Sequence, residues 1–231
     1  DILDLDLAAK EKGVSILPEC GLDPGIDLVL YAYCLKHFDK VSKLNSYCGG
    51  IPEKAACDNP LNYKISWNIH AALKSQMRDA TLLVNSEQVY VSAQDQHDNP
   101  FIHHIEFPEL GTLEAIPNGD AVHYSNLLKI DSDLVETGRY SLRWPGWCSF
   151  WNPMKRLGFL SDEPMKGLPA RVSPLEMVAN LLAPQLQYED NQKDLCVMVN
   201  EVEGVTRGRK QILTLSLLIE RDLTTGLMAM S

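Results

Sequence analysis

The chain has 231 residues, of which 45% are hydrophobic and 23% charged, a composition typical of a folded globular protein with a sizeable core. The net charge of −10 and the pI of about 5.0 argue against a nucleic-acid partner, and no apolar run approaches the ~20 residues of a membrane span, so we expect no membrane partner. No signal peptide and no Cys-x-x-Cys pair occur, so we expect a cytoplasmic protein with reduced thiols.

The first predicted elements are a helix and a strand. Asp1–Lys12 has helical apolar spacing and is followed by Gly13, a typical helix stop. Val14–Glu19 has the composition of a buried strand. The chain does not begin with Met, and its last residues, 226–231, resemble a helix cut short. We therefore expect a fragment of a longer protein.

A second helix is predicted after the turn that follows this strand. Asp23 has the character of a helix cap and Pro24 that of a first helical residue. The helix is expected to run to about Phe38, and its sequence is apolar nearly all round, which predicts burial.

The rest of the chain predicts an α+β fold, because strands and helices mix without a steady βαβ rhythm. Strands are predicted at 41–48, 63–67, 80–84, 88–93, 103–107, 112–116 and 140–144, with a hairpin turn at 85–87. Helices are predicted at 147–157 and 174–182, the second capped by Ser173. Two long strands, 195–203 and 210–220, are expected to form an antiparallel hairpin across a longer loop at 204–208.

The common nucleotide and hydrolase motifs are absent from the sequence. No Gly-x-Gly occurs, which excludes a Gly-x-Gly-x-x-Gly dinucleotide fingerprint, and no Walker loop, Gly-x-Ser-x-Gly elbow or His-Glu-x-x-His is present. Any nucleotide diphosphate must therefore bind mainly to residues outside this sequence.

The most informative segment joins the strand at 14–19 to the following helix. Its sequence is Glu19-Cys-Gly-Leu-Asp-Pro-Gly-Ile-Asp27. Such a junction presents backbone N–H groups and the positive end of a helix, where a ligand carboxylate can bind. Gly21 and Gly25 allow a close backbone approach. A tight, well-capped turn with no ligand explains the same pattern.

The same segment resembles the corresponding junction of the saccharopine dehydrogenase family, in particular the saccharopine reductases. Further stretches resemble motifs of that family in the same order: Cys48-Gly-Gly-Ile-Pro52, Asn59-Pro-Leu-Asn-Tyr-Lys-Ile-Ser-Trp67, Pro117-Asn-Gly-Asp120, Gly138-Arg-Tyr-Ser-Leu-Arg-Trp-Pro-Gly146 and Thr225-Gly-Leu-Met-Ala-Met-Ser231. The resemblance covers nearly the whole chain and is more specific for the family than for the substrate.

The resemblance implies a fold, a division into domains and a reaction. Residues 1–20 would be the tail of a Rossmann cofactor domain, 21–221 a substrate-binding and dimerisation domain, and 222–231 the start of a helix returning to the cofactor domain. The implied fold is a mixed, largely antiparallel sheet with helices on one face, in a homodimer. The implied enzyme uses NADP or NAD for hydride transfer at an amino-acid secondary amine or imine carbon.

Two positions depart from the family's arginine pattern. The family's Ser-Trp-Ser-Pro-Arg-Gly arginine aligns with His70, and the arginine of its Pro-Asn-Arg-Asp aligns with Gly119. Arginine holds a carboxylate through a fixed bidentate fork, which histidine cannot reproduce. Arg143 remains. The substrate therefore carries fewer carboxylates than saccharopine, or the site has been rebuilt.

Two residues of the junction are candidates for catalysis. The resemblance places Cys20 in the substrate pocket beside the hydride-transfer centre, where it would shuttle a proton or form a small pocket wall. Asp23 is expected to cap the helix, to act as a base, or to do both. Asp27, one turn further on, is a candidate for a salt bridge.

The remaining candidate residues are expected to bind ligands. Arg143 is the best side-chain ligand for a carboxylate, with a structural ion pair as the alternative. The predicted substrate-binding residues are Gly21, Leu22, Gly49, Gly50, Asn68, His70 and Arg143, and the predicted cofactor contacts are Gly21 and Gly25.

Two other groups of side chains are expected to be structural. His97, His103 and His104, with Asp95 and Asp98, match no standard metal-site spacing, so no metal is expected. The tryptophans at 144, 147 and 151 have the spacing of core residues rather than of a binding cage.

Two functions remain open. The first is an NAD(P)-dependent oxidoreductase of the saccharopine dehydrogenase type, with a carboxynorspermidine or lysine dehydrogenase as a variant. The second is a non-catalytic dimerisation or ligand-sensing relative that has lost the arginines.

Overall fold

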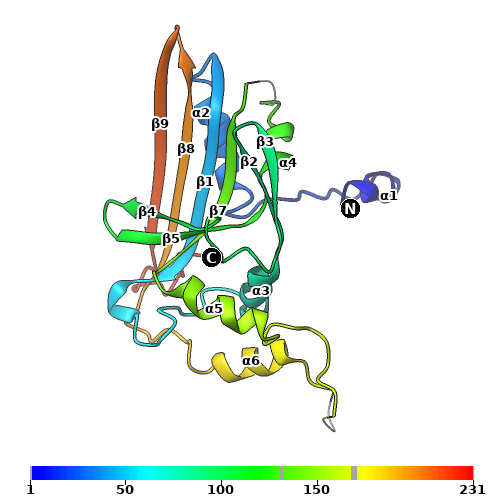
Figure 1. Ribbon diagram of the computed structural model, residues 1–231, viewed down its shortest axis with the longest axis vertical. Helices are drawn as coiled ribbons and strands as arrows, with labels where there is room; N and C mark the ends of the chain where they lie inside the picture. The colour runs from blue at the N-terminus through cyan, green and yellow to red at the C-terminus, as the bar shows by residue number, and fades with distance from the viewer. Residues whose placement is uncertain (1, 131–132, 168–170, 231) are drawn as a thin grey trace.

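A single mixed sheet organises the chain in the computed structural model, which describes residues 2–130, 133–167 and 171–230. The main strands follow the order β3-β2-β7-β1-β8-β9 (Figure 1), while β5 connects the β4–β5 hairpin to β7, and the short β6 pairs with β2. The pairs β1–β7 and β2–β6 are parallel and the other described pairs are antiparallel. The predicted mixed, largely antiparallel sheet is confirmed.

The described chain contains nine strands, six α-helices and three short 3-10 helices. The strands are β1 (Lys40–Pro52), β2 (Ala80–Val84), β3 (Glu87–Val91), β4 (His103–Phe107), β5 (Gly111–Pro117), β6 (Gly119–Asp120), β7 (Glu136–Arg143), β8 (Asp194–Thr206) and β9 (Arg209–Glu220). The helices are α1 (Asp6–Lys12), α2 (Ile26–Leu35), α3 (Ile69–Lys74), α4 (Ala121–Leu127), α5 (Trp147–Arg156) and α6 (Pro174–Leu182). Short 3-10 helices span Ile2–Leu5, Lys54–Ala56 and Ser75–Met77.

The helices occupy two places. Arg139 of β7 contacts both Tyr124 of α4 and Asp27 of α2, so these two helices cover the same face of the sheet. The helices α3, α5 and α6 gather at one end of the sheet, and α1 stands away from the body (Figure 1). The expectation of helices on one face therefore holds for α2 and α4 only. None of the described helices is long and apolar enough to span a bilayer.

Several local predictions are confirmed. Helix α6 has the predicted bounds, and the Ser173 hydroxyl accepts a hydrogen bond from the Glu176 N–H at 3.2 Å. The β2–β3 hairpin forms as predicted. The first helix stops at Gly13 as predicted, but α1 begins only at Asp6, because Ile2–Leu5 is a 3-10 helix. The long β8–β9 hairpin forms, but its turn is tighter than expected. Arg207 and Gly208 both have positive φ, which closes the hairpin in two residues.

Three predicted elements are wrong. The segment 14–19 is exposed and unpaired, with Leu17 81% exposed, because the described chain provides no neighbouring strand for it. Residues 63–67 form no strand, although Tyr63 is buried. Residues 222–230 form turns rather than a helix, with Asp222 accepting backbone hydrogen bonds. Asp1 and Ser231 lie outside the described residues.

Helix α2 is shorter and less buried than its sequence predicts. It begins at Ile26 with Gly25 as its N-cap, so the predicted cap at Asp23 is wrong. Asp27, Tyr31 and Cys34 form its buried face at helical spacing. Its opposite face is open, and Val29 is 68% exposed. An apolar sequence indicates what a helix can bury, but the packing partners decide what it does bury.

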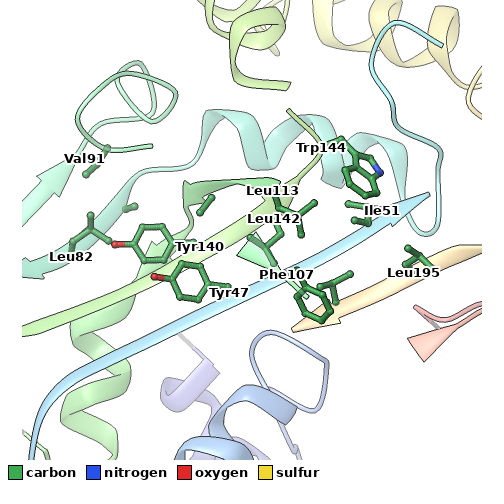
Figure 2. Close-up of a cluster of buried hydrophobic side chains, with 13 residues drawn as sticks. Tyr47, Ile51, Leu82, Val91, Phe107, Leu113, Tyr140, Leu142, Trp144 and Leu195 are labelled. Atoms are coloured by element: carbon green, nitrogen blue, oxygen red, sulfur yellow. The ribbon is translucent and has the colours of Figure 1, made fainter. Parts of the chain in front are cut away.

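Buried side chains form three clusters around the sheet. One is built mainly from strand residues, and in it Tyr47 and Tyr140 stack with centroids 5.1 Å apart, near Phe107 and Leu142 (Figure 2). The second joins α3, α5 and α6, and the third lies beneath α2. The tryptophans at 144, 147 and 151 are all buried, as predicted.

Candidate functional site

A cavity of about 390 Å³ lies where the segments that resemble family motifs meet. It is lined by the turn at 22–24, by β1 at 48–50, by Trp67, Ser75 and Arg78, by Asn118, by Ser141 and Arg143 of β7, and by Met230. A larger hollow of about 720 Å³ lies between the end of α2 and the β8–β9 turn. That hollow contains none of the predicted site residues, so the smaller cavity is the better candidate.

The turn before α2 is shaped by two glycines. The Gly21 N–H donates to the Pro24 carbonyl at 3.1 Å, and the Ile26 N–H donates to the Gly21 carbonyl at 3.0 Å. Gly25 has φ +149°, and a Cβ there would collide with the carbonyl of Gly21. Only glycine fits at this position. The turn places Leu22, Asp23 and Pro24 on the cavity wall.

A buried charge cluster anchors this turn to the sheet. Arg139 Nη2 donates to Asp27 Oδ2 at 2.9 Å and also contacts the Asp23 carboxylate. The Arg139 guanidinium lies 4.1 Å from the Tyr124 ring centroid. Burial raises the pKa of Asp27 to about 6, and burial lowers the pKa of Arg139 to about 10. The expected salt bridge of Asp27 is therefore present, and Asp23 shares its cation.

Strand alternation places the arginines of β7 on the face that α2 covers. Arg139, Ser141 and Arg143 point to one side, while Tyr140 and Leu142 enter the core on the other. The parallel pairing sets Cys48 of β1 beside Ser141. Burial raises the pKa of the Cys48 thiol well above its usual range, so the thiol stays neutral on the cavity wall.

Arg143 is the buried cation of this cavity. It is 6% exposed, and its Nη1 donates to the Leu142 carbonyl at 2.6 Å. Its guanidinium lies 5.2 Å from the Trp147 ring centroid and 5.5 Å from that of Tyr63. Within the described part of the chain, no carboxylate lies within 4 Å of its guanidinium. Arg143 therefore forms no ion pair with a described residue, which was the structural alternative to ligand binding.

Hydrogen bonds hold the aromatic support of Arg143 in place. Gln76 Oε1 accepts from Trp147 Nε1 at 2.8 Å and lies 3.0 Å from His97 Nε2. Burial lowers the pKa of His97 to about 3, so its ring is neutral and donates this bond. Gln76 Nε2 in turn donates to the hydroxyl of Ser75, which lines the cavity.

Arg78 brings a second guanidinium to the cavity, which the sequence motifs did not reveal. It is exposed, and its Nη1 donates to Asn118 Oδ1 at 3.1 Å. The neighbouring backbones explain this contact, because Ala80 of β2 pairs with Gly119 of β6. The cavity thus contains two guanidinium groups, although the sequence motifs pointed only to Arg143.

The two glycines of β1 are required by packing around the cavity. A Cβ on Gly49 would lie 2.5 Å from the Leu142 carbonyl oxygen. A Cβ on Gly50 would lie 2.9 Å from Met230. Met230 is held there because the Asp194 carboxylate accepts from its N–H at 3.1 Å.

The structure brings together about half of the predicted site residues. Leu22, Asp23, Gly49, Gly50 and Arg143 line the cavity. The others do not line it: Cys20, Gly21, Gly25, Asn68 and His70.

The predicted residues outside the cavity have local contacts. Cys20 is exposed, and its Sγ donates to the Pro18 carbonyl at 3.5 Å. Asn68 caps α3 by accepting from the Ala71 N–H at 3.0 Å, and His70 is exposed on that helix. The binding and catalytic roles expected for them stay predictions.

The histidines considered for a metal site point to different partners. His97 contacts Gln76, and His103 Nε2 lies 3.3 Å from the Tyr47 hydroxyl. Over the residues that the structure describes, no group of three potential metal ligands is found.

Comparison with known proteins points to one family. The model of the family described as "Saccharopine dehydrogenase C-terminal domain" matches residues 21–231. The alpha-aminoadipic semialdehyde synthase of Arabidopsis thaliana is 29% identical over 228 residues, which cover 93% of this chain and 21% of that protein. The saccharopine dehydrogenase [NADP(+), L-glutamate-forming] of Pyricularia oryzae is 32% identical over 170 residues, covering 70% of this chain and 36% of that protein.

A solved structure supports the fold. Apo histidine-tagged saccharopine dehydrogenase (L-Glu forming) from Saccharomyces cerevisiae superimposes with a TM-score of 0.81 at 21% identity, covering 95% of this chain and 63% of that one. The chain thus spans about a fifth to about a third of the length of the two curated relatives described above.

Proposed function

The chain belongs to the saccharopine dehydrogenase C-terminal domain family, and from this premise we propose that it is the substrate-binding domain of an NAD(P)-dependent oxidoreductase. The proposed reaction is hydride transfer at the carbon of an amino-acid secondary amine or imine. A homodimer is part of the same proposal. The relatives named above include an NADP-dependent, L-glutamate-forming saccharopine dehydrogenase.

One observation supports this proposal most: Arg143 is buried on the cavity wall without a described carboxylate partner. Removing a guanidinium from water is costly unless an anion compensates its charge. The carboxylate of an amino-acid substrate is an anion that fits, since arginine binds carboxylates through two parallel hydrogen bonds. In this proposal, Arg143 binds the substrate carboxylate, and the Trp147 ring positions the Arg143 guanidinium.

The described residues do not fit a nucleotide diphosphate. The sequence has no Gly-x-Gly, and the backbone of Gly21 occupies the direction in which a side chain at Gly25 would project. We therefore propose that NADP or NAD is held mainly by residues outside this chain, with Gly21 and Gly25 as the contacts that this chain supplies. The cavity would supply the substrate side of the reaction.

Among the residues proposed for proton transfer, Asp23 is the better placed. Asp23 lines the cavity, while Cys20 is exposed on the preceding segment. Because Asp23 contacts Arg139, its orientation is fixed by the buried charge cluster. We propose that Asp23 orients the substrate nitrogen and exchanges a proton with it, and that Cys20 has a secondary role.

The test uses the full-length protein and nucleotide absorbance. Saccharopine, carboxynorspermidine and lysine are assayed in parallel with NADP and with NAD. Turnover of one of them supports the proposal and identifies the substrate. Protein that binds no nicotinamide nucleotide contradicts it and favours the ligand-sensing alternative.

A further inference from the structure

We propose that Arg78 is the second carboxylate-binding residue of the cavity, so that Arg78 and Arg143 select a ligand with two carboxylates. This inference rests on the proposed function, because it takes the cavity as the substrate site. It adds a specificity-determining residue and the chemical class of the ligand, an aliphatic dicarboxylate.

The two arginines reach the same cavity from separate parts of the chain. Arg143 projects from β7 and is buried, while Arg78 precedes β2 and lies exposed at the rim. A ligand anchored at Arg143 and extending toward solvent would meet Arg78. Trp67, which is 47% exposed, offers an apolar wall for an aliphatic chain.

Charge pairing distinguishes Arg78 and Arg143 from Arg139 and Arg156. Arg139 contacts Asp23 and Asp27, and Arg156 contacts Asp95 and Asp98. In the ranges that the structure describes, no carboxylate lies within 4 Å of either Arg78 or Arg143. The chain carries 31 acidic residues against 21 lysines and arginines, so carboxylates are not scarce. Four other guanidinium groups also have no described carboxylate within 4 Å, but none of them lines this cavity: those of Arg171, Arg207, Arg209 and Arg221. Two such cations on one cavity, one of them buried, favour an anionic ligand.

Asn118 prepares Arg78 for such a ligand. Its Oδ1 accepts one of the five N–H donors of the guanidinium, and its own N–H donates to the Arg139 carbonyl at 2.8 Å. Asn118 is therefore tied to the strand that carries Arg143. The other donors of Arg78 remain available for a bidentate bond to a carboxylate.

The experiment measures binding of two probe anions to the full-length protein by calorimetry. Pentanedioate has two carboxylates and pentanoate has one. The variants are Arg78→Gln, Arg78→Lys and Arg143→Gln. Lys74→Gln is the control, because Lys74 is exposed in the same segment and pairs with exposed Asp162.

We expect wild type to prefer pentanedioate. Arg78→Gln should weaken pentanedioate by roughly tenfold and leave pentanoate unchanged, since a charge-assisted hydrogen bond of ~1.4 kcal/mol corresponds to a factor of ten. Arg78→Lys should restore part of the preference, because lysine keeps the charge without the fork. Arg143→Gln should weaken both probes, and Lys74→Gln neither.

The outcomes distinguish the two proposals. If Arg143→Gln weakens both probes while Arg78→Gln leaves the preference for pentanedioate intact, the role of Arg78 is overturned and the substrate site stands. Equal wild-type affinity for the two probes also overturns it. If Arg143→Gln changes neither affinity, or wild type binds neither probe, the substrate site itself is contradicted. Circular dichroism on heating confirms that each variant is folded.

Discussion

Arg139 and Arg143 lie four residues apart on the same face of β7, and both are nearly inaccessible to solvent. Arg139 contacts the carboxylates of Asp23 and Asp27, whereas Arg143 contacts aromatic rings and a backbone carbonyl. One strand therefore carries a cation that the fold neutralises and a cation without a described carboxylate partner, which we propose binds the ligand. A buried arginine must therefore be interpreted together with its counter-ion.

The largest expected effect comes from removing the neutralised arginine. Arg139→Met leaves Asp23 and Asp27 buried without their cation, which should lower the free energy of unfolding by ~3–5 kcal/mol. Urea unfolding at pH 7 measures this loss. The matched control is Arg156→Met, which removes an exposed arginine and should cost less than ~1 kcal/mol. Equal losses in the two variants would show that the Arg139 cluster is not structural.

The pH dependence of stability provides the second prediction. Burial raises the pKa of Asp27 to about 6 in the folded state, above the ordinary value of 3.8. The folded state therefore holds this proton more tightly, and the stability so gained is lost as the pH rises from about 4 to about 6. The change is at most about 3 kcal/mol, at ~1.4 kcal/mol for each pH unit.

Asp27→Asn isolates this effect from the other carboxylates. Urea unfolding of wild type and variant between pH 3.5 and pH 7 should give a difference in stability that changes across this window and is flat above it. A difference that stays constant with pH would contradict the raised pKa of Asp27.

A smaller effect is expected at the glycines that close the cavity. Gly49→Ala places a Cβ 2.5 Å from the Leu142 carbonyl oxygen, which is backbone and cannot easily move. We expect a loss of ~1–3 kcal/mol in unfolding free energy. Gly50→Ala is the comparison, because its Cβ would meet the flexible Met230 side chain and should cost less. The reverse order would mean that Met230 is held more rigidly than β7.

Local sequence patterns predicted much of the fold. Ser173 and Pro174 located the start of α6, because a cap followed by proline is a local signal. Val14–Glu19 failed because a strand needs a neighbour, which its own residues cannot supply. The end of the β8–β9 hairpin was predicted as a longer loop, since Arg207 at positive φ has no sequence signature.

The candidate site was also predicted only where local motifs identify its residues. The junction around Asp23 and the basic strand position Arg143 were recognisable as motifs, and both line the cavity. Period-two spacing in β7 would also have placed Arg139 and Ser141 on the face of Arg143. Arg78 could not be found this way, because only the pairing of Ala80 with Gly119 brings it beside Asn118.

The role of Arg143 as a ligand-binding cation is tested by Arg143→Met in the full-length protein, with urea unfolding and pentanedioate binding measured together. We expect a free energy of unfolding within ~1 kcal/mol of wild type, because no described ion pair is lost, and a pentanedioate affinity reduced at least about tenfold. A loss of ~3 kcal/mol in stability with unchanged affinity would contradict it, because Arg143 would then be a structural cation like Arg139.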